Sequence, residues 1–169
     1  MPKRGLQPIA GPETRLFILG SLPGDRSLAT GRYYAHPTNQ FWKLVGTLTG
    51  GDLAGLPYEA RLEVLARHGI GLWDVVGAAD REGSGDHAIR NAAHNPIGGL
   101  RRAYPLLEAI AFNGGRAAKD GLKLLAGAEG IRLIALPSSS GLARLPFAAK
   151  ATAWAELALF CRPPHSGGL

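Results

Sequence analysis

The sequence predicts an α/β protein in which helices flank a parallel sheet. Short apolar runs of strand length alternate with segments of helical periodicity along the 169 residues. This alternation is typical of a parallel sheet with helical crossovers. Four of the apolar runs end in loops rich in glycine, proline or serine. Because ligands bind beyond the carboxyl ends of such strands, the candidate site is expected among these four loops.

The first predicted strand covers residues 15–20 and stops at Gly20-Ser21-Leu22-Pro23-Gly24. Glycine gives the backbone freedom there and proline removes an N–H group, so a sheet ladder cannot continue. The other predicted strands cover residues 70–76, 106–112 and 131–136, and Pro137 ends the last of them.

The helix that follows the first loop is predicted from apolar residues at positions 41, 44, 45 and 48, which share one helical face. Asn39 lies at or near its N-cap, because Pro37 disfavours helix immediately before it. Further helices are predicted at residues 57–67, 117–125 and 142–160. Residues 21–38 and 77–105 read as long loops, within one domain that covers 1–169. Residues 1–14 form an irregular leader of that domain and residues 163–169 a flexible tail.

Composition restricts the compartment and the partners. The chain has 19 Lys and Arg against 13 Asp and Glu, a net charge of +6, and this excess suits phosphate but is also common in proteins that bind no nucleic acid. Cys161 is the single cysteine, so an internal disulfide is impossible and a reducing compartment fits. The sequence shows neither a secretory signal nor an apolar run long enough to span a membrane. We therefore expect a cytoplasmic protein without a membrane partner.

The loops offer amides and aromatic rings rather than a recognisable cofactor site. The sequence contains no Walker A loop, no dinucleotide fingerprint and no metal-ligand cluster, so we expect neither a cofactor nor a metal. Ser138-Ser139-Ser140-Gly141 lacks the Gly-x-Ser-x-Gly elbow of serine hydrolases and is better suited to helix capping or anion binding. Tyr34 could stack on a base, whereas Phe41 and Trp42 are expected in the core.

Five runs of residues, in this order, resemble those of the uracil-DNA glycosylase superfamily. They are Gly20-Ser21-Leu22-Pro23-Gly24; Tyr34-Ala35-His36-Pro37 followed by Asn39, Phe41 and Trp42; Leu72-Trp73-Asp74-Val75; Arg81-Glu82-Gly83-Ser84; and Leu136-Pro137-Ser138-Ser139-Ser140. The similarity covers residues 16–160 and is strongest to the hypoxanthine-DNA glycosylase (DNA-deoxyinosine glycosylase) branch. The second run is also similar to that of the mismatch-specific uracil/thymine glycosylases.

This resemblance implies a three-layer α/β/α fold with a central, mainly parallel four-stranded sheet. It also implies a monomeric, monofunctional DNA glycosylase that hydrolyses the bond between sugar and deaminated base in base excision repair. Hypoxanthine is the favoured base and uracil the main alternative, with xanthine a further candidate. The partner would be double- or single-stranded DNA that contains a deaminated base or an abasic site.

The sequence departs from most branches of the superfamily in two places. Most branches carry Asp, Asn or Glu in the first run, where this chain has Ser21 and Leu22, and His or Asn at the position of Leu136. Resemblance to the hypoxanthine branch assigns catalysis to Asn39, which would orient a water against the sugar, and Asp25 is the reserve candidate.

The remaining predicted site residues contact the base or the DNA. The base contacts are Ser21, Leu22, Tyr34 and Asn113, with Tyr34 stacking on the base and Asn113 reading its Watson–Crick edge. The DNA contacts are Gly24, Ser138, Ser139, Ser140, Gly141, Leu142 and Arg144, of which Leu142 would either wedge into the duplex or pack at a helix start. An abasic-site or damaged-DNA binding protein with little turnover is the alternative, and a serine hydrolase using residues 138–140 is a weaker one.

Overall fold

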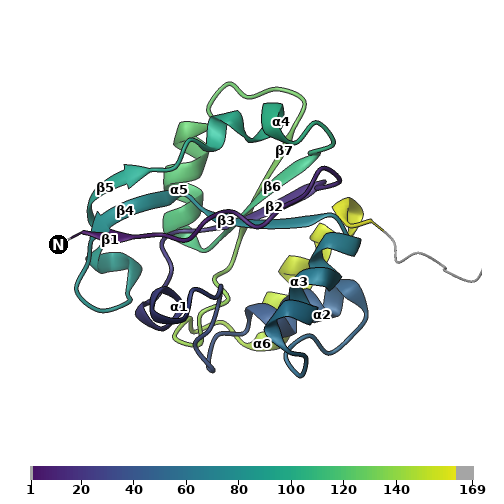
Figure 1. The fold of residues 1–169 in the computed structure, drawn as a ribbon, viewed down its shortest axis with the longest axis horizontal. Coiled ribbons are helices and arrows are strands. Elements are labelled where there is room, and N and C mark those ends of the chain that lie inside the picture. The colour runs from purple at the N-terminus through teal and green to yellow at the C-terminus, as the bar shows by residue number, and fades with distance from the viewer. Residues whose placement is uncertain (1, 163–169) are drawn as a thin grey trace, which may run out of the picture.

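A four-stranded parallel sheet forms the centre of the computed structural model, which describes residues 2–162 (Figure 1). The strands are β2 (Leu16–Gly20), β3 (Ile70–Asp74), β6 (Ala109–Asn113) and β7 (Arg132–Leu136), in the order β3-β2-β6-β7. All three pairings are parallel, so the four carboxyl ends meet at one edge. The predicted α/β fold with its central parallel sheet is confirmed. The predicted tail, 163–169, lies outside the described residues.

Helices cover both faces of this sheet (Figure 1). One face packs against α2 (Phe41–Thr49), α3 (Tyr58–Arg67) and α6 (Phe147–Trp154), and the other against α4 (Leu100–Ala103) and α5 (Gly115–Leu124). Successive residues of β2 alternate between the two cores, with Ile18 in one and Leu19 in the other. Phe41 and Trp42 are 0% and 4% exposed, so their predicted place in the core is confirmed.

A second sheet lies beside the first and was not predicted. It joins β1 (Lys3–Arg4), β4 (Val76–Asp80) and β5 (Arg90–His94) in antiparallel order β1-β4-β5. The expectation of an irregular leader at 1–14 is therefore wrong at β1. The expectation of a loop throughout 77–105 is wrong at β4 and β5. Most of β5 is exposed, so the hydrophobic alternation that reveals a half-buried strand is missing from its sequence.

Several predicted boundaries also change. The strand predicted at 70–76 ends at Asp74, and the chain then enters the second sheet at Val76. The loop 21–38 contains a short helix, α1 (Asp25–Thr30). The helix predicted at 142–160 begins only at Phe147, because Pro146 has an extended backbone, and a 3₁₀ segment, η3 (Ala155–Phe160), continues it. Two more 3₁₀ turns are η1 (Asp86–Ala88) and η2 (Ile97–Gly99).

None of the helices found within residues 2–162 has the length and apolarity needed to cross a bilayer.

Close packing between α5 and β6 gives a test of the fold. A methyl group on Gly121 would lie 2.1 Å from the ring of Phe112, which is fully buried. Alanine is usually the better helix former by about 1 kcal/mol, but overpacking a core typically destabilises by about 1–3 kcal/mol. Gly121→Ala is therefore expected to lower the free energy of unfolding in urea.

Gly115→Ala, in the same helix, is the matched control because a methyl group there would meet nothing within 4 Å. It is expected to leave the free energy of unfolding unchanged or slightly raised. Equal stability of the two variants would show that the helix does not approach the strand this closely.

Candidate active site

Three loops meet at the carboxyl edge of the parallel sheet. One follows β2, one precedes α2, and one follows β7. The last two touch directly, since a methyl group on Gly141 would lie 2.5 Å from the backbone oxygen of Thr38. The backbone N–H of Gln40 also donates to the carbonyl of Ser139 over 2.8 Å. The sheet therefore brings residues near 40 and near 140 into one site.

A chain of side-chain hydrogen bonds crosses this edge. The Ser139 hydroxyl donates to Asn39 Oδ1 over 2.8 Å and accepts a bond from Asn113 Nδ2 over 2.9 Å. Asn113 Nδ2 also donates to the hydroxyl of Tyr34 over 3.2 Å. The structure thus brings together four residues that were predicted separately from the sequence, one as catalytic, two as base contacts and one as a DNA contact.

The orientation of the Asn39 amide follows from these contacts. Its Oδ1 accepts the backbone N–H of Phe41 over 2.9 Å as well as the Ser139 hydroxyl. Because a backbone N–H can only donate, the atom that faces it must be the amide oxygen. Nδ2 is left without a partner among the described residues, and the side chain is half-buried. Asn39 therefore presents two N–H donors, and no free acceptor, to anything that enters the site.

Asn113 and Ser139 are held inside the protein. They are 7% and 1% exposed, and the backbone N–H of Ser139 donates to Asn113 Oδ1 over 2.9 Å. Both Nδ2 hydrogens of Asn113 have acceptors, and the Ser139 hydroxyl is both donor and acceptor. In this structure their polar atoms position Asn39 and Tyr34, rather than facing solvent where a base or a phosphate could reach them.

Tyr34 has an unusual backbone and a stacked ring. Its φ of 54° is in the left-handed region, which is uncommon for a residue other than glycine and often marks a functional site. The ring stacks on Phe41, with centroids 3.9 Å apart and planes 13° from parallel. Burial raises the pKa of the Tyr34 hydroxyl, so the group stays protonated at neutral pH. In this structure the Tyr34 ring therefore stacks on a core residue, Phe41.

Lys150 connects the loop that precedes α2 to the loop that follows β7. The sequence analysis did not include it among the site residues. It is 1% exposed, and its Nζ donates to Gln40 Oε1 over 2.7 Å and to the carbonyl of Ser140 over 2.9 Å. Burial lowers the pKa of Lys150. These bonds fix the immediate neighbours of Asn39 and Ser139. One sequence feature could have revealed Lys150. It stands among small apolar residues, Ala148-Ala149-Lys150-Ala151, in a segment with a predicted helix.

The loop after β2 faces the second sheet more than the site. Leu22 is 5% exposed and packs with Val76, Ala79 and Ile89, so its side chain lies in a separate small core. The Ser21 hydroxyl donates to Asp86 Oδ1 over 2.5 Å. Neither side chain is free to contact a base in this structure, in contrast to the sequence-based expectation.

Arg81 fastens that same loop. Its fully buried guanidinium donates to the carbonyls of Leu22, Pro23 and Gly83, over 3.2, 2.7 and 2.8 Å. This contact explains why the run beginning at Arg81 accompanies the run beginning at Gly20. Because the buried carbonyl of Leu22 would be costly to leave unpaired and one guanidinium binds three carbonyls at once, Arg81 fixes the shape of the loop.

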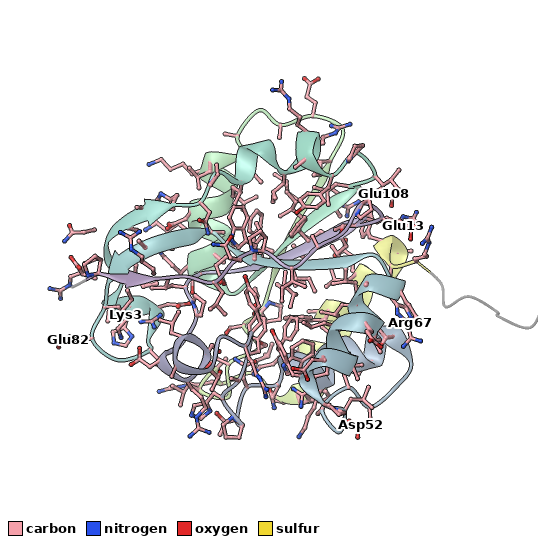
Figure 2. The ribbon with its side chains drawn as sticks, in the orientation of Figure 1. Lys3, Glu13, Asp52, Arg67, Glu82 and Glu108 are labelled. Atoms are coloured by element: carbon pink, nitrogen blue, oxygen red, sulfur yellow. The ribbon has the colours of Figure 1, made fainter. Side chains whose placement is uncertain are left out.

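Asp25 belongs to this bracing rather than to the network around Asn39. Its carboxylate lies 2.6 Å from Lys3 Nζ and 3.6 Å from Arg81, and its backbone N–H donates to Ser84 Oγ over 2.9 Å. The hydrogen bond from Lys3 holds the pKa of Asp25 below its usual range. Gly24 lies beside Ser84. Figure 2 shows Lys3 at the end of the molecule that carries the second sheet.

The loop after β7 turns back on itself and projects a leucine. The Ser138 hydroxyl accepts the N–H of Ser140 over 3.1 Å, and the Ser140 hydroxyl accepts the N–H of Leu142 over 3.2 Å. Leu142 is 90% exposed and precedes the helix by five residues, so the alternative that it packs at a helix start is wrong, and its role as a wedge stays a prediction. Gly141 and Arg144 are exposed beside it.

Asp74 is an additional carboxylate at this edge, at the end of β3. It is 3% exposed, and burial, together with the nearby Asp86 carboxylate, raises the pKa of Asp74 to about 7. The sequence analysis placed it in one of the five resembling runs but did not include it among the predicted site residues.

A hollow of about 690 Å³ lies elsewhere. Its lining includes Glu13, which precedes β2, and His68, which precedes β3, so it opens at the amino ends of the strands. Figure 2 shows Asp52 and Arg67, two other lining residues, on the side of the molecule away from Lys3. This hollow is not part of the candidate site.

Comparison with known proteins decides the family. The model of the uracil DNA glycosylase superfamily matches residues 8–158. The chain belongs to the uracil DNA glycosylase superfamily. It is 40% identical over 156 residues to the hypoxanthine DNA glycosylase of Methanosarcina barkeri, covering 92% of this chain and 98% of that one. It is 44% identical over 141 residues to the hypoxanthine DNA glycosylase of Methanosarcina acetivorans, covering 83% of this chain and 88% of that one.

A solved structure supports the same membership in the uracil DNA glycosylase superfamily. The solution NMR structure of a candidate uracil DNA glycosylase from Methanosarcina acetivorans superposes with a TM-score of 0.83. The two sequences are 39% identical, and the match covers 94% of this chain and 97% of the other. The predicted family and the uracil-DNA glycosylase-like fold are therefore confirmed.

Lys150 provides a test of how this glycosylase holds its site. Lys150→Met keeps much of the side-chain volume but removes the bonds to Gln40 and Ser140. We expect base excision to fall at least about tenfold, the equivalent of 1.4 kcal/mol, because the neighbours of Asn39 and Ser139 lose their anchor. Single-turnover rates on damaged DNA measure the effect.

Lys119→Met is the matched control, since it removes one positive charge from an exposed position of α5. It accounts for any general loss of attraction to DNA. Equal rates for the two variants would contradict a positioning role for Lys150.

Proposed function

We propose that this protein is a monofunctional DNA glycosylase that excises hypoxanthine from DNA, with uracil as a second substrate. The protein is a DNA glycosylase by family, and DNA is its substrate. The preference for hypoxanthine is supported by the names of two relatives that are at least 40% identical to this chain. Excision of a deaminated base is the first chemical step of base excision repair.

The fixed Asn39 amide is the observation that carries the mechanism. Its oxygen is occupied by Phe41 and Ser139, so it acts on the substrate through the N–H groups of Nδ2. An N–H group can hold a water by one lone pair while the other lone pair attacks the sugar carbon. An amide cannot remove the proton of that water, so its contribution is positioning and a fixed dipole rather than base catalysis.

The rest of the mechanism follows from the arrangement of the loops. A deaminated base rotates out of the duplex, which requires a few kcal/mol and less when the base is mispaired. The loop at Gly24 and the loop 138–142, together with Arg144, bind the flanking phosphates. Leu142 enters the duplex in place of the base. Asn113 and Tyr34 contact the base once it displaces the hydrogen bond that Asn113 Nδ2 donates to the Tyr34 hydroxyl.

The proposal excludes lyase chemistry through the one lysine near the site. A Schiff base needs a free, unprotonated amine, whereas Lys150 Nζ donates to two oxygens. We further propose that the protein acts as a monomer in the cytoplasm, on duplex or single-stranded DNA.

Removal of the Asn39 amide tests the proposed function. Asn39→Ala is expected to lower single-turnover excision of hypoxanthine by about 100- to 1,000-fold, about 2.7–4 kcal/mol, as for other single polar groups that act in the transition state. Affinity for abasic-site DNA is expected to change only a few-fold. Rates are measured on duplexes with one deoxyinosine or one deoxyuridine, by alkaline cleavage of the product.

Gln7→Ala is the control, because Gln7 also carries an amide but lies exposed outside the site. Undiminished excision by Asn39→Ala would move the catalytic assignment to Asp25. Absence of excision by the unmodified protein on hypoxanthine, xanthine and uracil, with tight abasic-site binding, would favour a damage-binding protein instead.

The exposed leucine gives a second test. Leu142→Ala is expected to slow excision from duplex DNA about tenfold or more, because burying a leucine side chain is worth about 1.5–3 kcal/mol. Excision from single-stranded DNA is expected to be unchanged, since no base stack has to be filled. Leu159→Ala, at a position that is 77% exposed, is the matched control. An equal loss on both kinds of DNA would contradict the wedge.

A further inference from the structure

Asp74 lies at the carboxyl edge of the sheet, close to Gly20 and the Tyr34 hydroxyl, although the proposed function does not use it. It ends β3 and pairs in register with Gly20 of β2, at the carboxyl edge of the sheet. A methyl group on Gly20 would lie 2.6 Å from Asp74 Oδ1 and 3.1 Å from the Tyr34 hydroxyl. The carboxyl group and that hydroxyl therefore both pack against Gly20, and only glycine lets the two groups come this close to the strand.

The Asp74 carboxyl group is buried, and one of its oxygens receives no hydrogen bond from the described residues. The residue is 3% exposed, and its Oδ2 has no hydrogen-bond partner among residues 2–162. A buried polar atom without a partner is costly, and such atoms in native proteins usually have a function or a missing ligand. The Tyr34 hydroxyl beside it belongs to the network that reaches Asn39.

The charged and titratable groups around Asp74 come from two segments. Asp86 and Arg81 follow β4, and Tyr33 and Tyr34 precede α2. Burial and then the Asp86 carboxylate raise the pKa of Asp74 to about 7, and Arg81 opposes them. The carboxyl group thus becomes largely neutral as the pH falls below 7, and in that form it carries one O–H donor and one acceptor.

We propose that Asp74 is a base-contacting residue that binds the N–H and the adjacent C=O of the flipped, deaminated base. This inference rests on the proposed glycosylase function and adds the group that recognises the base. A neutral carboxyl group accepts a bond from the ring N–H and donates one to the neighbouring oxygen. Hypoxanthine, xanthine and uracil all present this pair of groups.

The second of these bonds also assists the reaction. As the bond to the sugar breaks, the departing base gains negative charge, part of it on its carbonyl oxygen. An O–H donor aimed at that oxygen binds more strongly in the transition state than in the ground state, which raises the rate. An ionised Asp74 has no such donor and repels the charge. Excision is therefore expected to fall as the pH rises through about 7.

Two variants of Asp74 separate recognition from structure. Asp74→Leu removes both polar atoms and is expected to lower hypoxanthine excision at least about 100-fold at pH 6. Asp74→Asn keeps one donor and one acceptor but does not titrate, so it is expected to excise within about tenfold of the unmodified protein at pH 6. Its rate is expected to stay level between pH 6 and 9, where the unmodified protein loses activity.

Asp86→Asn tests the origin of the pH profile. Without the neighbouring negative charge the pKa of Asp74 falls, so the midpoint of the profile is expected to move to lower pH. Loss of the profile in Asp74→Asn, with a shifted profile in Asp86→Asn, supports the proposal. An unshifted profile that persists in Asp74→Asn overturns it.

Stability and binding provide readouts that do not depend on turnover. A merely structural Asp74 would make Asp74→Leu less stable. We expect the variant instead to melt at a higher temperature above pH 7, because an unpaired buried carboxylate penalises the native state most where it is ionised. The unmodified protein is expected to prefer duplexes with non-cleavable 2′-fluorodeoxyinosine over matched undamaged duplexes. Asp74→Leu is expected to lose this preference.

The outcomes distinguish this inference from the proposed function. If the unmodified protein excises no deaminated base, the proposed function fails. If it excises hypoxanthine and Asp74→Leu excises it equally well, only the role of Asp74 fails. Should Asp74→Leu not fold, the pH profile and the binding preference of Asp74→Asn decide the question.

Discussion

The hydrogen bond between the Ser139 hydroxyl and Asn39 Oδ1 joins two loops that are 100 residues apart in the chain. The site depends on it, because together with the backbone N–H of Phe41 it fixes which end of the Asn39 amide faces outward. The bond is itself held on both sides. Asn113 fixes Ser139, and Lys150 fixes the residues that follow Asn39 and Ser139. A neutral amide can act only by position, so this rigid support is what gives it catalytic value.

Buried polar groups gather at the same edge of the sheet as this bond, and each departs from what a stable core alone would favour. Arg81 and Lys150 are buried cations whose hydrogen bonds hold loop carbonyls in place. Asp74 is a buried acid without a protein partner for Oδ2. Tyr34 keeps a left-handed backbone. Buried charges, unpaired polar atoms and strained backbone are expected mainly at functional sites. Here all of them lie at the carboxyl edge of the parallel sheet.

The parts of the fold that the sequence revealed are those with strong hydrophobic patterns. Strands β2 and β6 are fully buried, and their continuous apolar runs were found within a few residues of their true ends. Helix α2 was found because its apolar face repeats with helical spacing. The second sheet escaped notice because β1 has two residues and β5 is mostly exposed, so neither carries a pattern that distinguishes a strand from a loop.

The sequence by itself determined the family, the parallel sheet, and the placing of Asn39, Tyr34 and Asn113 at its loop edge, because local propensity and ordered runs of residues are written along the chain. Tertiary structure alone decided what each of these groups faces. Ser139 turned inward, Leu22 joined a separate core, Asp25 paired with Lys3, and Asp74 Oδ2 has no hydrogen-bond partner among residues 2–162. Hydrogen bonding and burial depend on distances between residues far apart in sequence, and a linear pattern does not contain those distances.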